Sequence, residues 1–269
     1  MHVLSVSSLK GGVGKTTVTL GLASAAFARG LRLLVVDLDP QADVSTGLDV
    51  NPTGTLTIAD VLAAPKEKTV RAAIAPSGWT RGRGGKVDVL VGSPRALHFD
   101  VPNPTVRDVW KLEEALAYVE ADYDLVLIDC APSLNALTRT AWTASDRVVV
   151  VTEPGLFSVA AADRALRAID EIRRSLSPRL QPLGIIVNRV RGQSLEHQFR
   201  IKELREMFGP LVLTPHLPER TSLQQAQGAA QPLHAWPGQT AEDLSHAFDV
   251  LLDRVQRSFQ TGSHPLEQD

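Results

Sequence analysis

Apolar residues occur along this chain in two alternating patterns. Short, nearly continuous apolar runs are typical of parallel strands buried on both faces, and longer segments with apolar residues three or four positions apart are typical of helices packed on such a sheet. The runs predict strands at residues 3–6, 31–36, 87–91, 124–129, 147–151, 183–187 and 211–213. The helical spacing predicts helices at residues 17–29, 43–48, 58–63, 106–119, 134–143, 159–176, 195–208 and 240–259. This alternation predicts an α/β fold, a doubly wound and mostly parallel sheet flanked by helices.

One segment departs from this alternation. Residues 65–86 have no clear period, and their second half is rich in glycine and carries three cations, Arg81, Arg83 and Lys86. We interpret this part as a solvated hairpin loop, with contact to DNA or to a partner as the alternative. A turn is expected before it, over residues 51–54, because this stretch contains a proline and a glycine.

The composition is that of a single globular domain. The chain has 269 residues, 43% of them hydrophobic, so we expect one domain over residues 1–260 and a polar, disordered tail over residues 261–269. A formal net charge of -2 provides no global attraction to nucleic acid or to an anionic membrane. The single cysteine, Cys130, excludes an intrachain disulfide framework and a CxxC metal site. The lone cysteine predicts a reducing, cytoplasmic setting, and the lack of a recognisable leader segment or membrane span predicts a soluble protein.

The first predicted strand ends in a stretch that combines glycines with lysine and threonine. Residues 8–17 read Ser-Leu-Lys-Gly-Gly-Val-Gly-Lys-Thr-Thr and lead into the first predicted helix. Glycines allow backbone N–H groups to turn toward an anion, and the start of a helix favours negative charge. The residues expected to surround the phosphates of a nucleotide are Lys10, Gly11, Gly12, Val13, Gly14, Lys15, Thr16 and Thr17. In such a loop Lys15 reaches the β- and γ-phosphates, and the Thr16 hydroxyl ligates Mg²⁺.

Aspartates follow two of the predicted strands, at the ends where ligands bind in open α/β sheets. Asp37 and Asp39 occupy alternate positions just after the strand at 31–36, and Asp129 ends the strand at 124–129. Two carboxylates that face a phosphate site are suited to Mg²⁺, which offsets their charge. A hydrophobic strand that ends in an acid is the Walker B pattern, so we expect Asp129 to hold Mg²⁺ directly or through water.

The phosphate loop does not match the standard pattern G-x-x-x-x-G-K-[ST], because Leu9 stands where the first glycine is required. Residues 10–17 instead resemble the deviant Walker A motif of the ParA/MinD family of ATPases. The resemblance implies that Lys10 is the signature lysine of that family, which reaches the phosphates of the partner chain in a nucleotide-sandwich dimer. It therefore adds Lys10 to the catalytic lysine expected at Lys15.

The acidic motifs carry the same resemblance. Residues 37–41, Asp-Leu-Asp-Pro-Gln, look like the A′ motif of the family. This implies that Asp39 positions or activates the attacking water and that Asp37 supports the Mg²⁺ shell. After Asp129 the family usually shows Cys-Pro-Pro-Ser, and here Ala131 replaces the first proline. That change affects the loop after the strand and leaves the acid in place.

The second half of the chain holds the candidates for base and DNA contacts. By resemblance, Asn188 hydrogen-bonds the adenine edge, and the loop with Pro215 and Pro218 covers the base; a plain turn role for Asn188 is the alternative. The candidates for DNA contact are Arg189, Arg191 and Arg220. Four arginines of the predicted helix at 159–176 form either a solvated face or part of a DNA-binding stripe, and the sequence leaves both readings open.

The resemblance covers most of residues 3–235 and implies a function. ATP and Mg²⁺ would drive formation of a homodimer that binds DNA nonspecifically on the nucleoid, and slow hydrolysis, stimulated by a ParB-like partner, would release it to partition chromosomes, plasmids or other cargo. The alternative is a MinD-like or orphan ParA-like regulator of cell division that acts through protein partners. No membrane partner is expected, because a MinD-like protein should end in a basic amphipathic helix and this tail is acidic.

Other classes fit less well. An iron–sulfur carrier needs bridging cysteines, and the chain has only Cys130. A GTPase usually shows an Asn-Lys-x-Asp motif, and residues 188–191, Asn-Arg-Val-Arg, lack its acid. A noncatalytic binding module is possible only if Asp39 and Asp129 do not act. Sequence-specific operator binding is not expected, since no helix-turn-helix segment precedes the phosphate loop.

Overall fold

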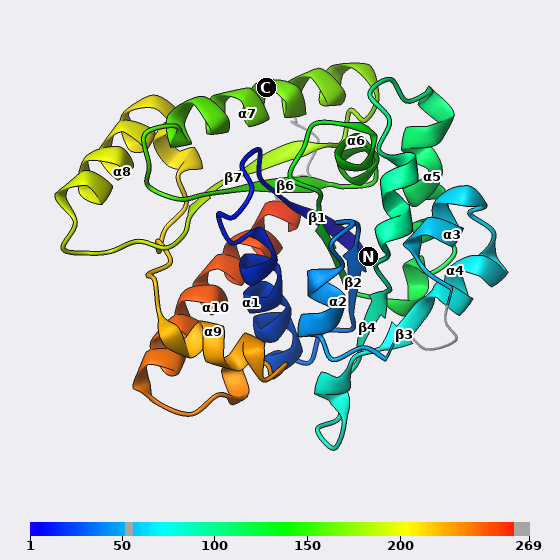
Figure 1. Ribbon diagram of the computed structural model, residues 1–269, viewed down its shortest axis with the longest axis horizontal. Helices are drawn as coiled ribbons and strands as arrows, with labels where there is room; N and C mark the ends of the chain where they lie inside the picture. The colour runs from blue at the N-terminus through cyan, green and yellow to red at the C-terminus, as the bar shows by residue number, and fades with distance from the viewer. Residues whose placement is uncertain (52–55, 261–269) are drawn as a thin grey trace, which may run out of the picture.

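The computed structural model describes residues 1–51 and 56–260. A seven-stranded sheet with the order β3-β4-β2-β5-β1-β6-β7 lies at its centre (Figure 1). The strands are β1 (His2–Ser7), β2 (Leu33–Asp37), β3 (Ile74–Pro76), β4 (Val87–Leu90), β5 (Leu125–Asp129), β6 (Arg147–Thr152) and β7 (Gln181–Val187). All neighbouring strands are parallel except β3 and β4, which confirms the predicted doubly wound, mostly parallel sheet.

The register of the three central strands determines where the functional side chains meet. In the pairing of β2 with β5, Asp37 stands beside Asp129. In the pairing of β1 with β5, Val6 stands beside Asp129 on the other side. Because these strands are parallel, the segments that follow all three leave the sheet at the same edge. The phosphate loop and both acidic motifs are therefore neighbours.

Successive side chains of a strand point to opposite faces of the sheet and feed two separate cores. In β2, Leu33 and Val35 belong to one core, and Leu34 and Val36 belong to the other. All four are fully buried. Burial on both faces is the physical reason for the nearly continuous apolar runs in the sequence.

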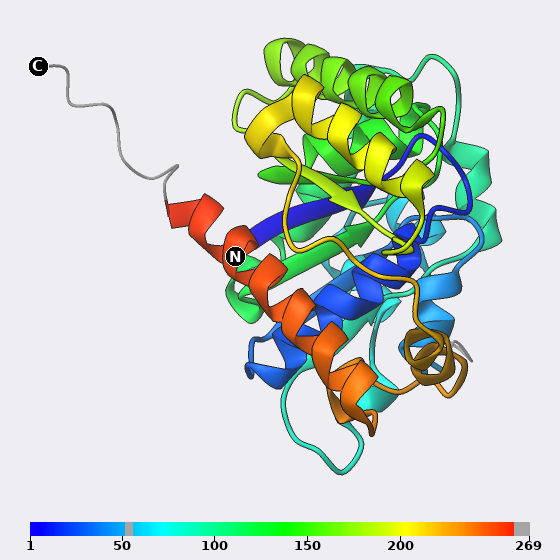
Figure 2. The ribbon, with the colours of Figure 1, turned by 90° about the vertical axis from the view of Figure 1, so that its left-hand side faces the viewer.

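Helices cover both faces of the sheet. One core is closed by α1, α2, α9 and α10, and the other is closed by α3 to α8. Figure 2 shows α1 and α10 side by side on one side of the sheet, with α7 and α8 on the other. The helices are α1 (Lys15–Ala28), α2 (Asp43–Gly47), α3 (Ile58–Ala63), α4 (Glu67–Ala73), α5 (Val106–Ala117), α6 (Ala136–Thr143), α7 (Ser158–Ser175), α8 (Leu195–Phe208), α9 (Thr221–Gly228) and α10 (Gln239–Gln260).

The segment 65–86 contains α4, the edge strand β3 and the 3₁₀ turn η1 (Gly78–Thr80), elements too short to show a period in the sequence. Because β3 pairs antiparallel with β4, the glycine-rich stretch between them is the hairpin loop that we predict. One prediction about local structure was wrong. Residues 211–213 do not form a strand: the 3₁₀ turn η4 (Gly209–Leu211) ends there, and Val212 makes only an isolated bridge to Ile185. Residues 52–54 of the predicted turn and the tail at 261–269 lie outside the described residues.

The loop after η1 is exposed, and its arginines have local partners. Arg81 pairs with Asp49 at 2.9 Å, and Arg83 donates a hydrogen bond to Gln231 at 2.7 Å. These contacts favour the interpretation as a solvated loop.

The contact between α1 and α10 is closest at Gly21. A Cβ atom at this position would lie 2.1 to 2.5 Å from three ring carbons of Phe248, a side chain that is fully buried. Interiors are packed at crystal-like density, so the ring has no free volume to move into. The absence of a side chain at Gly21 is thus what lets α10 lie against the helix that carries the phosphate loop.

We expect Gly21→Ala to lower the free energy of unfolding by about 1–3 kcal/mol, because overpacking outweighs the better helix propensity of alanine. Urea unfolding followed by circular dichroism measures the change. The matched control is Gly228→Ala at the end of α9, where an added Cβ meets no atom within 4 Å. A Gly21→Ala protein as stable as this control would contradict the close packing of α10 on α1.

Candidate nucleotide-binding site

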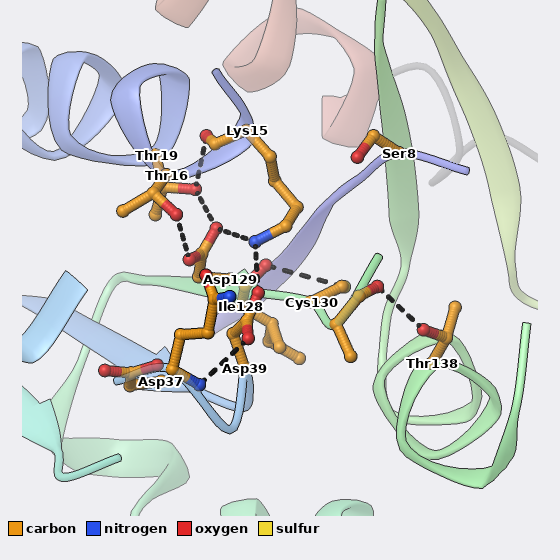
Figure 3. A network of polar contacts seen from close by, with 12 residues as sticks. Ser8, Lys15, Thr16, Thr19, Asp37, Asp39, Ile128, Asp129, Cys130 and Thr138 are labelled. Atoms are coloured by element: carbon orange, nitrogen blue, oxygen red, sulfur yellow. Dashed lines mark hydrogen bonds and ion pairs between the residues drawn. The ribbon is translucent and has the colours of Figure 1, made fainter. Parts of the chain in front are cut away.

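Lys15 lies at the centre of a buried polar cluster at the carboxyl edge of the sheet (Figure 3). Its Nζ is 3.0 Å from Asp129 Oδ1 and 3.2 Å from Asp39 Oδ2, and only 6% of the residue is exposed. Burial alone would lower the pKa of Lys15, but the charges of Asp129 and Asp39 outweigh burial and raise it. The lysine is therefore a fixed positive charge at the start of α1, where a polyphosphate would bind.

Asp129 is held from two consecutive turns of α1. The hydroxyls of Thr16 and Thr19 each donate a hydrogen bond to its carboxylate, at 2.8 Å. Thr19 was not among the candidates from the sequence. Its spacing of four residues from Lys15 was the available signal, since residues four apart lie on the same face of a helix.

Asp37 has a different environment. One of its oxygens accepts hydrogen bonds from the backbone N–H and the hydroxyl of Ser45, at 2.9 and 2.7 Å. The other, Oδ1, is buried without a hydrogen-bond partner in the described part of the chain. Burial, together with the charge of Asp129, raises the pKa of Asp37 to about 7. Ser45 was also missed from the sequence, because its contact depends on how α2 folds back over β2.

The phosphate loop is supported from β7. Gly12 and Gly14 adopt positive φ angles of 80° and 86°, which residues with a side chain rarely adopt. Asn188, 2% exposed, donates a hydrogen bond from Nδ2 to the carbonyl of Val13 at 2.9 Å. A Cβ on Gly14 would lie 2.3 Å from that nitrogen. In this structure Asn188 therefore supports the loop, and its side-chain oxygen makes no hydrogen bond to another described residue.

The other candidates for base contact lie next to Asn188. The segment with Pro215 and Pro218 runs along the end of β7, where Leu217 N–H donates to the Val187 carbonyl at 2.9 Å. Val190 and Pro218 form an isolated parallel bridge. The structure thus brings together residues that are about 30 positions apart, as base recognition by both segments requires.

Lys10 lies at the rim of the site, and it is exposed. Its ammonium group forms an ion pair with Glu153, from the loop after β6. Glu153 was not a candidate from the sequence. It also lines a cavity of about 330 Å³ together with Arg189, Arg191, His197 and Glu219.

The three arginines proposed for DNA contact are exposed and lie near this cavity. Arg189 donates a hydrogen bond to the carbonyl of Gly12 in the phosphate loop. Arg191 pairs with Glu219 at 2.6 Å, and Arg220 donates to the Glu219 carbonyl at 3.4 Å. The structure therefore brings these arginines to the same side as the phosphate loop.

On α7, aspartates accompany several of the arginines. Arg167 pairs with Asp163 at 2.8 Å, and Arg173 and Arg174 pair with Asp170 at 2.7 and 2.8 Å. These pairs favour the reading of α7 as a solvated helix face over the reading as a DNA-binding stripe.

Cys130 carries no chemistry here. It is fully buried, and burial raises the pKa of its thiol to about 12. A protonated, inaccessible thiol is neither a nucleophile nor a metal ligand.

A parallel sheet with a glycine-rich loop after β1, a lysine at the start of α1 and aspartates at the ends of β2 and β5 defines a nucleotide-binding P-loop protein. A family model described as "AAA domain" matches residues 1–182. The chain is 34% identical to the chromosome partitioning protein ParA of Caulobacter vibrioides over 238 residues, which is 87% of this chain and 86% of that protein. It is 31% identical to the chromosome-partitioning ATPase Soj of Thermus thermophilus over 262 residues, which is 95% of this chain and 97% of that protein. The chain belongs to the ParA/MinD superfamily of ATPases, as its motifs predict.

Solved structures share the fold. The cobyrinic acid a,c-diamide synthase from Mycobacterium smegmatis with bound ADP and magnesium has a TM-score of 0.78 and 24% identity, and covers 97% of this chain and 96% of its own. The cell division ATPase MinD from Pyrococcus furiosus has a TM-score of 0.74 and 25% identity, and covers 96% of this chain and 99% of its own. A cobyrinic acid a,c-diamide synthase and a cell division ATPase thus share this architecture, so the fold alone does not select between their functions.

The raised pKa of Asp37 predicts a pH-dependent stability for the protein without metal or nucleotide. Between pH 4 and 7 the unfolded carboxyl is ionised and the folded one holds its proton, so folding takes up a proton. The free energy of unfolding should therefore fall as the pH rises through this window, by at most about 1.4 kcal/mol per pH unit.

We expect Asp37→Asn to reduce this slope, as measured by urea unfolding in EDTA from pH 5 to pH 8. The control is Asp43→Asn, an exposed aspartate on the same short helix as Ser45, which should follow the wild-type profile. An Asp37→Asn profile parallel to the wild type would show that Asp37 ionises as readily in the folded protein as in the unfolded chain.

Proposed function

We propose that the protein is a ParA-like, Mg²⁺-dependent ATPase whose ATP-bound form is a sandwich dimer that binds DNA nonspecifically and releases it after hydrolysis. Such a cycle would drive chromosome or plasmid partitioning or the positioning of other cargo. The observation that carries the proposal is the different placement of two lysines at one loop. Lys15 is buried against carboxylates of its own chain, whereas Lys10 is exposed at the rim. In the proposed dimer, Lys10 would reach a phosphate held by the second chain.

In the hydrolysis step, the residues around Lys15 would exchange partners. Phosphate oxygens that bind at the start of α1 compete with Asp39 and Asp129 for the ammonium of Lys15. The Asp39 carboxylate, once released from Lys15, accepts a hydrogen bond from a water and orients it toward the γ-phosphorus. Attack by that water forms a bond between its oxygen and the γ-phosphorus and breaks the bond between the γ-phosphorus and the bridging oxygen. A proton of the water passes to a phosphate oxygen, giving ADP and phosphate.

The residues that would hold Mg²⁺ are Thr16, Asp129 and Asp37. They fit the ion, because all three offer oxygen ligands and the Asp37 Oδ1 atom is buried without a partner among the described residues. Sites of this kind use one or two carboxylates together with phosphate oxygens and water. When bound, the ion neutralises charge on the phosphate oxygens. Burial raises the pKa of Asp37, and the charge of a bound Mg²⁺ would offset this effect, so Asp37 would be ionised when the ion is present.

Dimer formation would require Lys10 to leave Glu153. In the single chain this carboxylate neutralises Lys10. The ATP phosphates of a second chain offer a higher density of negative charge than one carboxylate, so the exchange favours the dimer only when ATP is bound. Since ADP lacks the γ-phosphate, hydrolysis weakens the attraction and releases the partner.

DNA binding would use the exposed arginines beside the site. Arg189, Arg191 and Arg220 lie near the loop that a dimer would enclose, and two chains would combine two such sets. Because the net charge of the chain is -2, DNA binding requires such a local group of arginines. Counterion release makes the affinity for DNA sensitive to salt. In this proposal the protein associates with the nucleoid through DNA, hydrolyses ATP slowly on its own and is released when a ParB-like partner stimulates hydrolysis.

The position of α10 argues against a membrane-bound MinD-like role. Its apolar face, including Phe248, Leu252 and Val255, is buried in the core beside α1. That face is not available to enter a lipid surface. In the described part of the chain, no helix has the length and apolar character needed to cross a membrane.

The proposal predicts binding to duplex DNA that depends on ATP and on Lys10. We expect binding with ATP or a slowly hydrolysed analogue and not with ADP. Because log affinity falls linearly with log salt, raising the salt fourfold from 50 mM should weaken binding by at least about tenfold. Lys10→Ala should abolish dimerisation and DNA binding while ATP still binds each monomer. Fluorescence anisotropy with labelled DNA, light scattering and nucleotide titration measure the three quantities.

Lys68→Ala is the matched control, an exposed lysine on α4 on the opposite part of the sheet from β7. It should behave as the wild type. If ATP drives dimerisation but no nucleotide state binds DNA, the partition role is wrong and a regulator acting through protein partners takes its place. If Lys10→Ala dimerises normally, the cross-chain role of Lys10 is wrong.

A further inference from the structure

The loop that follows Asp129 is held by a residue from a distant part of the chain. Residues 130–135 connect the end of β5 to α6. Backbone contacts fix the start of this loop: Cys130 N–H donates to the Val6 carbonyl at 3.2 Å, and Leu38 N–H donates to the Asp129 carbonyl at 3.1 Å. Thr138 donates to the Ala131 carbonyl at 3.1 Å (Figure 3).

Asp100 holds the second half of the loop. One carboxylate oxygen of Asp100 accepts hydrogen bonds from Ser133 Oγ at 3.4 Å and Asn135 Nδ2 at 3.3 Å. The other accepts from the backbone N–H of Leu137, in the first turn of α6, at 3.1 Å. The side chains of Ser133 and Asn135 make no other hydrogen bond to described residues.

Asp100 also caps the N-terminus of α6, which the residue at the N-cap position does not do. Asn135 stands at the N-cap of α6 and makes no capping hydrogen bond, and the first turn contains no acidic residue. A carboxylate near a helix N-terminus accepts from its free N–H groups and interacts favourably with the helix dipole. Asp100 supplies this cap from the end of the 3₁₀ turn η2 (Pro94–Phe99), which follows β4.

The position of the loop connects this contact to the reaction. β5 lies between β2 and β1 in the sheet, so residues 130–135 emerge between the A′ segment with Asp39 and the phosphate loop. Hydrogen bonds from Thr16, Thr19 and Lys15 fix the Asp129 side chain itself. None of these contacts involves Asp100, whereas in the following loop the side chains of Ser133 and Asn135 are held by Asp100, beside a backbone hydrogen bond from Ala136 N–H to the Val101 carbonyl at 3.3 Å.

We propose that Asp100 is a positioning residue for ATP hydrolysis, which holds the loop 130–135 beside Asp39 and the γ-phosphate site in the geometry that hydrolysis needs. The inference rests on the proposed ATPase activity. Lys15 and the phosphate loop bind ATP, whereas Asp100 orders the loop beside the reacting group. Loss of Asp100 therefore reduces the rate of hydrolysis and leaves the affinity for ATP almost unchanged, because Lys15 and the phosphate loop keep all their contacts.

The test compares Asp100→Ala with the wild type and with Asp108→Ala. Asp108 caps the neighbouring helix α5: its carboxylate accepts from Thr105 N–H at 3.1 Å and Thr105 Oγ1 at 2.6 Å. Hydrogen bonds from Thr105 and Lys111 lower the pKa of Asp108 to about 2. It makes no hydrogen bond to residues 130–135, so it controls for the loss of a helix cap.

Three quantities are measured on the full chain: kcat, the dissociation constant for nucleotide and the rate of amide hydrogen exchange. In ATPase assays with a fluorescent analogue to measure nucleotide affinity, Asp100→Ala should lower kcat by about tenfold, a change of about 1.4 kcal/mol in the barrier, and should change the dissociation constant by less than about twofold. In hydrogen-exchange experiments without nucleotide, amides in residues 130–138 should exchange faster in Asp100→Ala and at the wild-type rate in Asp108→Ala.

Asp100→Asn is the second variant, in case Asp100→Ala folds poorly, because the amide oxygen keeps one acceptor and should give an intermediate kcat. Asn135→Ala completes a double-mutant cycle, in which the effects of Asp100→Ala and Asn135→Ala on kcat should be less than additive. Unchanged kcat in both Asp100 variants, or additive effects in the cycle, would overturn the inference. A wild type that binds ATP but never hydrolyses it would instead overturn the proposed function, and the inference with it.

Discussion

The ammonium group of Lys15 offsets the negative charge that the parallel strands bring to one edge of the sheet. Asp129 and Asp39 both lie within ion-pair distance of it, and Asp37 stands beside Asp129 in the β2–β5 register. Carboxylates buried so close together cannot all remain charged without a counterion. Lys15 compensates two of them, and the third responds through a raised pKa. The register of the strands therefore determines both which carboxylates meet and how their charges are balanced.

The position of Lys15 depends in turn on the packing of α1. The helix begins at Lys15, directly after the phosphate loop, and is buried on most of its length between the sheet and α10. Gly21 brings the two helices close, and Phe248 fills the space that a larger residue would take. Because α1 cannot shift without disturbing this core, its first residues are fixed relative to the ends of β2 and β5.

Contacts between distant segments surround this centre and differ in kind. Asn188 supports the phosphate loop from a buried position, whereas Glu153 holds Lys10 through an exposed ion pair that a competing charge can replace. Asp100 holds the side chains of Ser133 and Asn135 in a loop whose other contacts lie at its beginning and at its end, where Ala136 N–H donates to the Val101 carbonyl at 3.3 Å. The buried contact of Asn188 is suited to holding the phosphate loop in one conformation. The exposed pair of Lys10 and Glu153 is suited to a step in which Lys10 changes its partner.

The sequence alone predicted most of the strands and helices in their order and the candidate residues at the centre of the site, because both depend on local signals. Burial on both faces makes a strand continuously apolar, and a phosphate loop needs glycines, lysine and threonine at fixed spacing. Lys15, Thr16, Asp39 and Asp129 therefore were identified and lie together in the structure. Weak local signals explain the wrong strand at 211–213 and the elements not predicted within 65–86, which are too short to show a period.

Only the tertiary structure decided which partners these residues have. Thr19, Ser45, Glu153 and Asp100 carry no motif, and each reaches the site through contacts that arise when separate elements pack together. The same holds for the pKa of Asp37, which depends on burial and on a neighbour in another strand. A sequence pattern reports what a residue can do in its own element, and the pairing of elements decides the charge, burial and hydrogen bonds under which it does so.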